Sequence, residues 1–258
     1  MLRLWIMAAA LGLAASVPVD IEANKLSEIL RIENIATRNS FLENILLGLL
    51  EDARGTMLNG SDTVPVLDPL VVNEIEVGDE ILPFPGAGVT AKDITVTQLS
   101  TFVVDSLSIN MASLIPQRYR MQLELHIPNF LIDVGNYDLS IPNLFGANIF
   151  GNGDGKINII EPRIKANILI APRISISNGI FIRMVSSEVQ FSLTGFEPQI
   201  TGMLNDEGVT DFINLFLKNL IPELLEFFET EITEFLSATV LEVGNEILSD
   251  LNLGSILG

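Results

Sequence analysis

The chain offers few residues of the types that catalyse reactions. It has one histidine, His126, and no cysteine, so a thiolate nucleophile, a thiolate zinc site and a disulfide framework are all excluded. His126 stands next to Glu124 on the polar side of an alternating segment, where any triad partners would have to share the same wet face. Gly-x-Ser-x-Gly, His-Glu-x-x-His and Gly-Lys-[Ser/Thr] motifs are absent. We therefore interpret His126 as a surface residue and predict a protein that is not an enzyme; an extracellular esterase using His126 is a distant alternative.

The segment from Asn152 to Glu161 has the composition of a calcium-binding loop. If Gly155 is aligned with the invariant glycine of an EF-hand, then Asn152, Asp154 and Glu161 fall on ligand positions. Phe150, however, occupies the first ligand position, and the flanking residues are typical of strands rather than helices. The sequence therefore favours a glycine-rich hairpin turn at this place, and we expect neither a metal site nor a cofactor.

Composition defines the kind of partner that the protein can have. Of the 258 residues 48% are hydrophobic and 18% are charged, and the mean hydropathy is +0.43, so the chain must bury a large core. Acidic residues outnumber basic ones by 33 to 14, which gives a net charge of −19. That charge repels nucleic acid phosphates and anionic lipid headgroups. Nucleic acid is therefore excluded as a partner.

The first sixteen residues are typical of a secretory signal peptide. Arg3 provides the positive charge, an apolar run extends from Leu4 to Ala15, and small residues precede a cleavage point before Val17. The alternative is a membrane anchor, but this apolar run is shorter than the roughly 18 residues that a spanning helix needs. We predict a signal peptide over residues 1–16, a single domain over residues 17–258, secretion into extracellular fluid, no stable membrane insertion, and a monomer.

The periodicity of apolar residues changes twice along the chain. Spacings of three and four between Asn24 and Arg54 predict helix, in two segments, and the residues from Gly55 to Asp68 predict a loop. In that loop Asn59 begins a glycosylation sequon, which is either modified or a simple turn. From Val71 to Phe196 alternating residues predict consecutive strands that form an antiparallel meander.

The C-terminal region from Asp211 to Leu251 is again helical. Pro222 suits the first turn of a helix, and the apolar residues after it recur every three or four positions as far as about Asp250, with acidic residues on the other side. One helix of that length would be roughly 43 Å long. A sheet with one apolar face would have to curl around it. We therefore predict the α+β class, with a long C-terminal helix wrapped by a strongly curved antiparallel β-sheet and with further helices at the N-terminus.

Several short motifs, in their order and spacing, resemble one family. They are Asp68-Pro69-Leu70, the segment from Ile132 to Leu139, the segment from Gly151 to Lys156, and Phe212-Ile213-Asn214 leading into Leu220-Ile221-Pro222-Glu223. Together they are similar to the insect takeout and haemolymph juvenile-hormone-binding family. The resemblance implies the tubular lipid-binding fold of bactericidal/permeability-increasing protein, in which an apolar tunnel takes a lipid or terpenoid. Family members usually carry an N-terminal cysteine pair, which this chain lacks.

From these observations we expect a non-enzymatic carrier that binds an elongated hydrophobic molecule, such as a fatty acid or terpenoid, in an internal tunnel. The alternative is an extracellular interaction or structural protein whose core is filled by its own side chains. Candidates for the tunnel wall are the aromatic, methionine and apolar residues of the strands and of the last helix. They are Phe102, Met111, Met121, Leu123, Leu125, Phe130, Ile132, Tyr137, Phe191, Phe212, Phe216, Leu225, Phe228, Ile232 and Val243.

Overall fold

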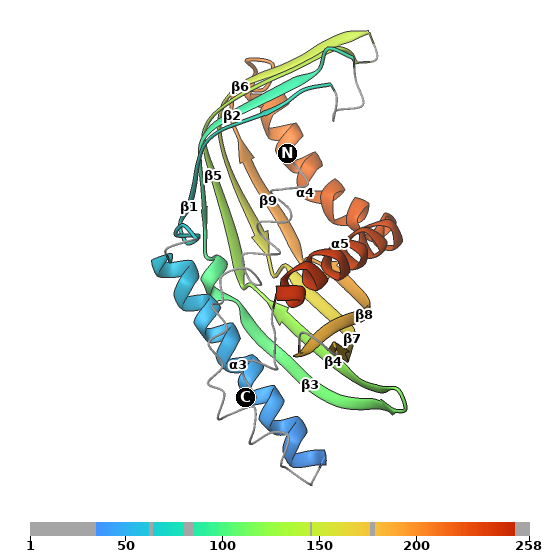
Figure 1. The fold of residues 1–258 in the computed structure, drawn as a ribbon. Coiled ribbons are helices and arrows are strands. Elements are labelled where there is room, and N and C mark those ends of the chain that lie inside the picture. Colours follow the sequence, from blue (N-terminus) through green and yellow to red (C-terminus); the bar gives the residue numbers. More distant parts are fainter. Residues whose placement is uncertain (1–34, 62–63, 80–84, 145, 176–178, 251–258) are drawn as a thin grey trace.

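The computed structural model describes residues 35–61, 64–79, 85–144, 146–175 and 179–250 (Figure 1). The predicted signal peptide and the helical residues 24–34 therefore lie outside the described residues. In chain order the elements are α3 (Ile35–Asn59), β1 (Leu70–Val77), β2 (Gly88–Thr97), the 3-10 helix η1 (Leu99–Thr101), β3 (Val103–Leu114), β4 (Gln117–His126), β5 (Asn129–Leu144), β6 (Ala147–Ile160), β7 (Arg163–Ser175), β8 (Gly179–Ser192), β9 (Gly195–Ile200), α4 (Glu207–Phe227) and α5 (Glu229–Asp250).

The strands form two sheets, which follow one another along the length of the molecule (Figure 1). Sheet A has the order β1-β2-β5-β6-β9 and sheet B the order β3-β4-β7-β8. Every ladder is antiparallel, as predicted. The prediction of a simple meander is wrong, because successive hairpins alternate between the sheets. Strands that are adjacent in one sheet, such as β2 and β5, are therefore separated in the sequence by a whole hairpin of the other sheet.

The chain crosses between the two sheets at a seam where three crossings lie side by side. The amide of Ile127 donates to the carbonyl of Pro162 at 3.0 Å, and the amide of Glu161 donates to that of Pro128 at 3.1 Å. The amide of Thr194 donates to the carbonyl of Ile160 at 2.9 Å. These bonds satisfy backbone groups that would otherwise lose their ladder partners at the bend.

Helix α3 is longer at its C-terminus than the sequence predicted. The loop was expected to begin at Gly55, but the helix continues to Asn59 and ends where Gly60 adopts a positive φ of 70°. Space around Gly55 is open, with nothing within 4 Å of an added Cβ, and a single glycine costs a helix only about 1 kcal/mol. Gly60 supplies the left-handed residue that ends helices, and its amide donates to the carbonyl of Thr56 at 2.7 Å.

Helix α3 also covers a small core at the edge of sheet B. Phe102 and Met57 have 1% and 2% of their full exposure and are the largest fully buried side chains among the described residues. They pack with Leu99. The guanidinium of Arg54 lies 4.1 Å from the centre of the Phe102 ring and donates to the Phe102 carbonyl at 2.9 Å. A cation–π contact and a charge-assisted hydrogen bond therefore attach α3 to the start of β3.

The C-terminal region contains two helices rather than the single one predicted. Asp206 caps the N-terminus of helix α4, since its carboxylate accepts from the amide of Val209 at 2.9 Å, and Pro222 lies inside this helix instead of opening a new one. The break comes at Phe228, after which α5 begins with Glu229. The sequence placed the boundary at the wrong residue because proline is only a local signal; before Pro222, α4 is attached to β9 of sheet A by Asn214 and Lys218.

Asparagine side chains attach the C-terminal helices to the outermost strands. Asn214 of α4 accepts from the amide of Ile200 in β9 at 2.8 Å and donates to its carbonyl at 2.9 Å. Asn245 of α5 binds both backbone groups of Met184 in β8 in the same way, at 2.8 and 3.1 Å. An edge strand has unpaired backbone groups, and each amide side chain supplies the donor and the acceptor that a further strand would supply.

Helix α3 covers the edge strand β3, as α4 covers β9 and α5 covers β8. Glu43 of α3 accepts from the amide of Ile109 at 2.8 Å. Arg54 on the same helix binds the carbonyls of Ser100 and Phe102. Both edges of sheet B and the β9 edge of sheet A are therefore closed by side chains of helices.

The glycine-rich segment lies within strand β6 and is not the hairpin turn that we predicted. Its glycines permit a close crossing of the segment after β9: an added Cβ on Gly151 would lie 2.6 Å from the Met203 sulfur, and one on Gly153 only 2.4 Å from the Thr201 hydroxyl. The Thr201 hydroxyl donates to the Asp154 carboxylate at 2.5 Å. Glycine is therefore present at these positions because another backbone segment passes close to the strand, which is a common reason for glycine within a strand. Among the described residues, no group of three or more acidic or histidine side chains is arranged to hold a metal ion.

Candidate functional site

Sheet B has one continuous apolar face. The register aligns Ile109, Met121 and Ile168 in one row, and Leu107, Leu123, Ala166 and Val189 in the next. Because side chains alternate between the two faces of a strand, each row belongs to one face. This face comprises Leu107, Ile109, Met111, Tyr119, Met121, Leu123, Leu125, Ile164, Ala166, Ile168, Ile170, Met184, Val189 and Phe191.

Sheet A has a matching apolar face. Val72, Ile94 and Val134 lie in one row across β1, β2 and β5. Val96, Ile132 and Ile157 lie in another across β2, β5 and β6. Including the neighbouring rows, this face comprises Val72, Ile75, Ile94, Val96, Phe130, Ile132, Val134, Tyr137, Ile157, Ile159, Phe196 and Pro198.

The apolar faces are only partly covered. Ile109, Leu125 and Ile168 have 3–5% of their full exposure, whereas Met121, Leu123, Ala166 and Phe191 on the same face are half-buried. On sheet A, Ile94 has 6% of its exposure, whereas Ile132, Val134 and Ile157 are half-buried. A solid sandwich core would bury such central side chains almost completely. The described elements therefore leave apolar surface available along both sheets.

The predicted residues of the C-terminal helices divide into two groups. Val243 has 8% of its exposure, and α5 lies against the apolar side of β8, where a Cβ on the adjacent Gly244 would meet the Met184 side chain at 2.5 Å. Leu225 and Ile232 are half-buried. In contrast, Phe212, Phe216 and Phe228 have 64%, 48% and 42% of their full exposure. The rings of Phe212 and Phe216 stack with centroids 6.2 Å apart.

Three other predicted residues make contacts that are primarily structural. Phe102 is the centre of the core under α3, and Phe130 packs against that core. The Tyr137 hydroxyl donates to the Thr201 carbonyl at 2.5 Å, and burial raises the pKa of this phenol, with a further contribution from the charge of Asp154. These residues connect elements to one another, and the remaining strand candidates lie on the two apolar faces.

The structure also adds residues that the sequence selection missed. Ala166, Ile168 and Val189 lie in the middle of the sheet B face, and Ile157 and Ile159 extend the sheet A face across β6. Strand alternation was the signal that would have found them, since residues 164–170 alternate as clearly as residues 119–127. The selection favoured aromatic and methionine side chains and so passed over small and aliphatic ones.

Two surface depressions are formed by described residues away from the apolar faces. One, of about 510 Å³, crosses the polar side of sheet A at Thr95, Asp133, Lys156, Asn158 and Gln199. The other, of about 270 Å³, follows the exposed side of α4 at Phe212, Phe216 and Glu223. Both are shallow, and neither is enclosed by the two sheets.

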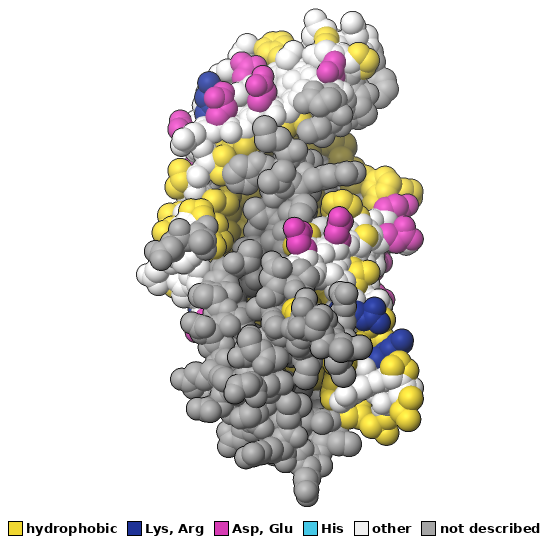
Figure 2. Space-filling view, in the orientation of Figure 1, with side chains coloured by type: hydrophobic (Ala, Val, Ile, Leu, Met, Phe, Trp, Pro, Cys, Tyr) yellow, Lys and Arg dark blue, Asp and Glu magenta, His cyan; other side chains and the backbone are white. Residues whose placement is uncertain are grey.

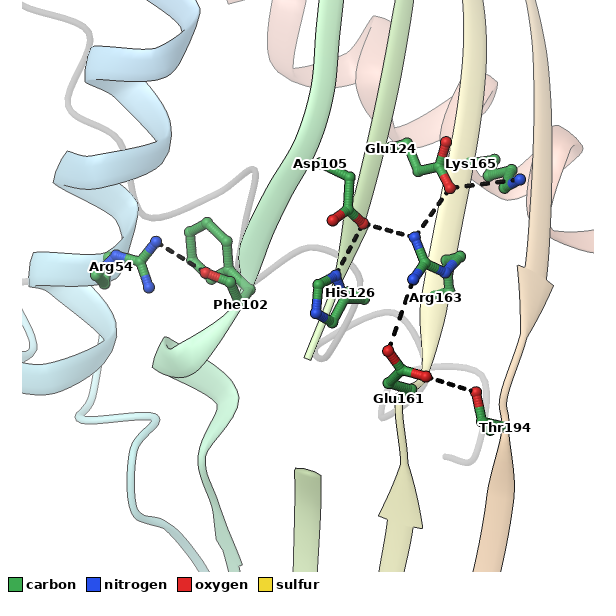
Figure 3. A network of polar contacts seen from close by, with 9 residues as sticks. All are labelled: Arg54, Phe102, Asp105, Glu124, His126, Glu161, Arg163, Lys165 and Thr194. Atoms are coloured by element: carbon green, nitrogen blue, oxygen red, sulfur yellow. Dashed lines mark hydrogen bonds and ion pairs between the residues drawn. The ribbon is translucent and has the colours of Figure 1, made fainter. Parts of the chain in front are cut away.

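The histidine belongs to a polar network at the seam (Figure 3). His126 Nδ1 lies 2.8 Å from Asp105 Oδ2, and the Arg163 guanidinium lies 2.6 Å from the same oxygen. Arg163 also contacts Glu124 at 2.9 Å and Glu161 at 3.8 Å. Lys165 pairs with Glu124, and the Thr194 hydroxyl donates to Glu161 at 2.8 Å.

This network joins the strands where the chain crosses between the sheets. The hydrogen bond from His126 is the main cause of a lowered pKa for the Asp105 carboxyl, and the positive charges of His126 and Arg163 add to it. No hydroxyl nucleophile among the described side chains is hydrogen-bonded to His126. The arrangement orients and pairs charges, and the described residues supply the acid–histidine pair of a triad without its nucleophile.

Comparison with known proteins agrees with this geometry. In the solved structures, Takeout 1 of Epiphyas postvittana matches with a TM-score of 0.53 and 14% identity, over 84% of this chain and 94% of that one, which shows the same fold. A lipopolysaccharide binding protein matches more weakly, with a TM-score of 0.35 and 10% identity, over 69% of this chain and 36% of that one. No curated protein matches the sequence. The family model described as haemolymph juvenile hormone binding protein matches residues 8–257, and the chain therefore belongs to the haemolymph juvenile hormone binding protein family.

Proposed function

We propose that the protein is a secreted carrier, without enzymatic activity, which binds an elongated hydrophobic molecule such as a fatty acid or a terpenoid between its apolar faces. Membership of a hormone-binding family supports a carrier. The observation that carries the proposal is the partial exposure of central residues such as Leu123 and Ala166 on the face of sheet B. A ligand would complete the burial that the described protein residues leave unfinished.

Apolar burial alone is sufficient to bind such a ligand. Burying about 300–400 Å² of an acyl or isoprenoid chain contributes on the order of 8–10 kcal/mol, from which the cost of ordering the ligand must be subtracted. Both sheets present long rows of aliphatic side chains and few polar groups on these faces. The ligand class is therefore long and apolar, with little demand for polar recognition.

The direct test is the mass spectrum of an organic extract of the purified protein. A carrier retains a lipid from the expressing cell or exchanges it for an added one, and native mass spectrometry detects the complex. The competing function is an extracellular structural or interaction protein with a filled core. A delipidated, correctly folded sample that binds no fatty acid or terpenoid probe at all would establish that alternative.

Enlarging a residue at the centre of the apolar face distinguishes an open face from a solid core. Ala166 lies between Leu123 and Val189 in the register, and Ala166→Phe should block probe binding at a small cost in stability. The same substitution at the exposed Ala147 is the matched control and should change neither property. Val243 is unsuitable, since it is buried where α5 packs on β8. A loss of about 1–3 kcal/mol in Ala166→Phe without any wild-type binding would indicate a solid core.

Secretion is the remaining part of the proposal. The apolar run from Leu4 to Ala15 supports a signal peptide, and no described helix is both long enough and apolar enough to cross a bilayer. Protein recovered from the medium of an expressing eukaryotic cell should begin at Val17 in N-terminal sequencing. Retention of the chain in the membrane pellet with Met1 intact would contradict it.

A further inference from the structure

The hairpin between β3 and β4 ends in an exposed apolar tip. Ile115 has 93% of its full exposure, the highest value among the large apolar side chains of the described residues, and Leu114 has 72%. The pairing of β4 with β7 stops at Tyr119, so residues 114–118 form a two-stranded hairpin that extends past the β4–β7 pairing, as Figure 1 also shows. A projecting tip of this kind is convex, so it does not form a groove for a peptide or a helix.

Of the arginines whose side chains the structure describes, three lie beside this tip. Arg118 and Arg120 are on β4, and Arg183 is on β8. They alternate with Tyr119, Met121 and Met184, so they stand on the side of the sheet opposite to its apolar face. Arg183 pairs with Ala171, the residue after the Ile170 that pairs with Tyr119, so Arg118 and Arg183 both lie at the end of the β4–β7 pairing from which the hairpin extends.

These arginines differ from the other described cations. Arg54, Arg163 and the lysines at 92, 156, 165 and 218 all form ion pairs with carboxylates. With the described residues, Arg118, Arg120 and Arg183 form no ion pair, although the chain carries an excess of nineteen negative charges. The nearest acid along β8 is Glu188, about 17 Å from Arg183 at 3.4 Å per residue.

Figure 2 shows the result on one surface: basic side chains lie directly next to the apolar end of the hairpin, whereas acidic side chains lie over the upper part and the C-terminal helices. The charge of the tip is therefore opposite to that of the molecule. An acidic protein keeps unpaired arginines together at a cost in mutual repulsion, which an anionic partner relieves.

We propose that this tip, comprising Leu114, Ile115, Arg118, Arg120 and Arg183, docks the protein on an anionic phospholipid surface. The aliphatic side chains enter the interface between headgroups and acyl chains, and the guanidinium groups bind lipid phosphates and carboxylates. A bilayer suits the convex apolar tip better than an acidic protein would, because a protein partner would need a matching pocket. The contact is peripheral and reversible, and the inference does not depend on the carrier function proposed above.

Vesicle flotation tests this proposal with purified protein in the processed form that the expressing cell yields. Vesicles of phosphatidylcholine alone are compared with vesicles that also contain phosphatidylserine, at low and at high salt. We expect binding that requires phosphatidylserine and is lost at high salt, where charges are screened. Each arginine near such a surface is expected to contribute about fivefold, so the triple variant R118Q/R120Q/R183Q should bind on the order of a hundredfold more weakly.

A matched control removes the same charge elsewhere. The variant K92Q/K156Q/K218Q loses three cations that are paired with carboxylates away from the tip, and it should retain most of the binding. Ile115→Ser should weaken binding about tenfold through lost apolar burial. Circular dichroism and thermal unfolding confirm that each variant is folded.

A second measurement depends on a gain of signal rather than a loss. Ile115→Trp places an indole at the tip, and its fluorescence should shift to the blue with phosphatidylserine vesicles only. Equal binding of the two triple variants, no shift at position 115, or equal binding to both vesicle types would overturn the proposal. So would a dimer in solution that R118Q/R120Q/R183Q dissociates, since the tip would then be an interface between two copies.

Discussion

Replacing Asn214 by alanine removes the attachment of α4 to the edge of sheet A. The side chain makes two hydrogen bonds with the backbone of Ile200, at 2.8 and 2.9 Å, in a partly buried position. Each bond contributes about 1 kcal/mol net, and the freed amide and carbonyl of Ile200 have restricted access to water, so Asn214→Ala should cost about 2–3 kcal/mol. For a domain of this size that corresponds to a fall of about 5–10 °C in Tm.

The matched control is on the same helix. Asn219 is exposed, and its side chain donates only to the Leu215 carbonyl one turn earlier, so Asn219→Ala should change the free energy of unfolding by no more than about 0.5 kcal/mol. Urea unfolding followed by circular dichroism measures both variants. If Asn214→Ala and Asn219→Ala unfold at the same urea concentration, the edge-closing role of Asn214 is refuted.

Three further outcomes are expected. The pKa of Asp105 is lowered from its ordinary value of 3.8, chiefly by the hydrogen bond from His126, so its contribution to stability is complete above that pH and is lost as the pH falls below it. The stability difference between wild type and His126→Ala should therefore narrow below pH 3.8 in acid urea titrations; a constant difference would argue against the pairing. Gly153→Ala should destabilise the protein, because the new Cβ would lie 2.4 Å from the Thr201 hydroxyl. Gly55→Ala should stabilise it by about 0.5–1 kcal/mol, because a Cβ there has no atom within 4 Å. Unfolding curves in which the two variants change stability in the opposite directions would refute this. Asn59 is exposed at the end of α3, and glycosidase treatment should lower the mass of the wild type but not of Asn59→Gln; an unchanged wild-type mass would show that Asn59 is not glycosylated.

The elements of this fold are largely predictable from local patterns, whereas their arrangement is not. Alternation from Tyr119 to Ile127 correctly predicts a strand with one apolar face, because the backbone geometry of a strand imposes a period of two. Nothing in the sequences of β2 and β5 indicates that they pair, because the hairpin between them, β3–β4, belongs to the other sheet. Pro222 likewise lies inside α4, so the proline by itself does not mark the boundary between the two helices.

The motifs on which the family resemblance rests contain polar residues that form hydrogen bonds between separate elements of the fold. Asp68 accepts from the amides of Gln98 and Ser100 at 2.8 and 2.9 Å, Tyr137 binds Thr201, and Asn214 binds Ile200. Polar groups in such contacts need one particular residue type, so they remain recognisable in a sequence. The apolar faces require only hydrophobic side chains of suitable volume. This explains why the sequence indicates the fold more sharply than the ligand-binding residues.

The closure of three sheet edges by helices has a consequence for self-association. On the remaining edge, β1, no helix side chain among the described residues hydrogen-bonds to the strand backbone, and an edge strand in general is a template for strand addition between copies. Glu74 and Glu76 lie along this strand and are exposed. Two such strands pairing antiparallel would bring carboxylates together, and their repulsion opposes aggregation at neutral pH.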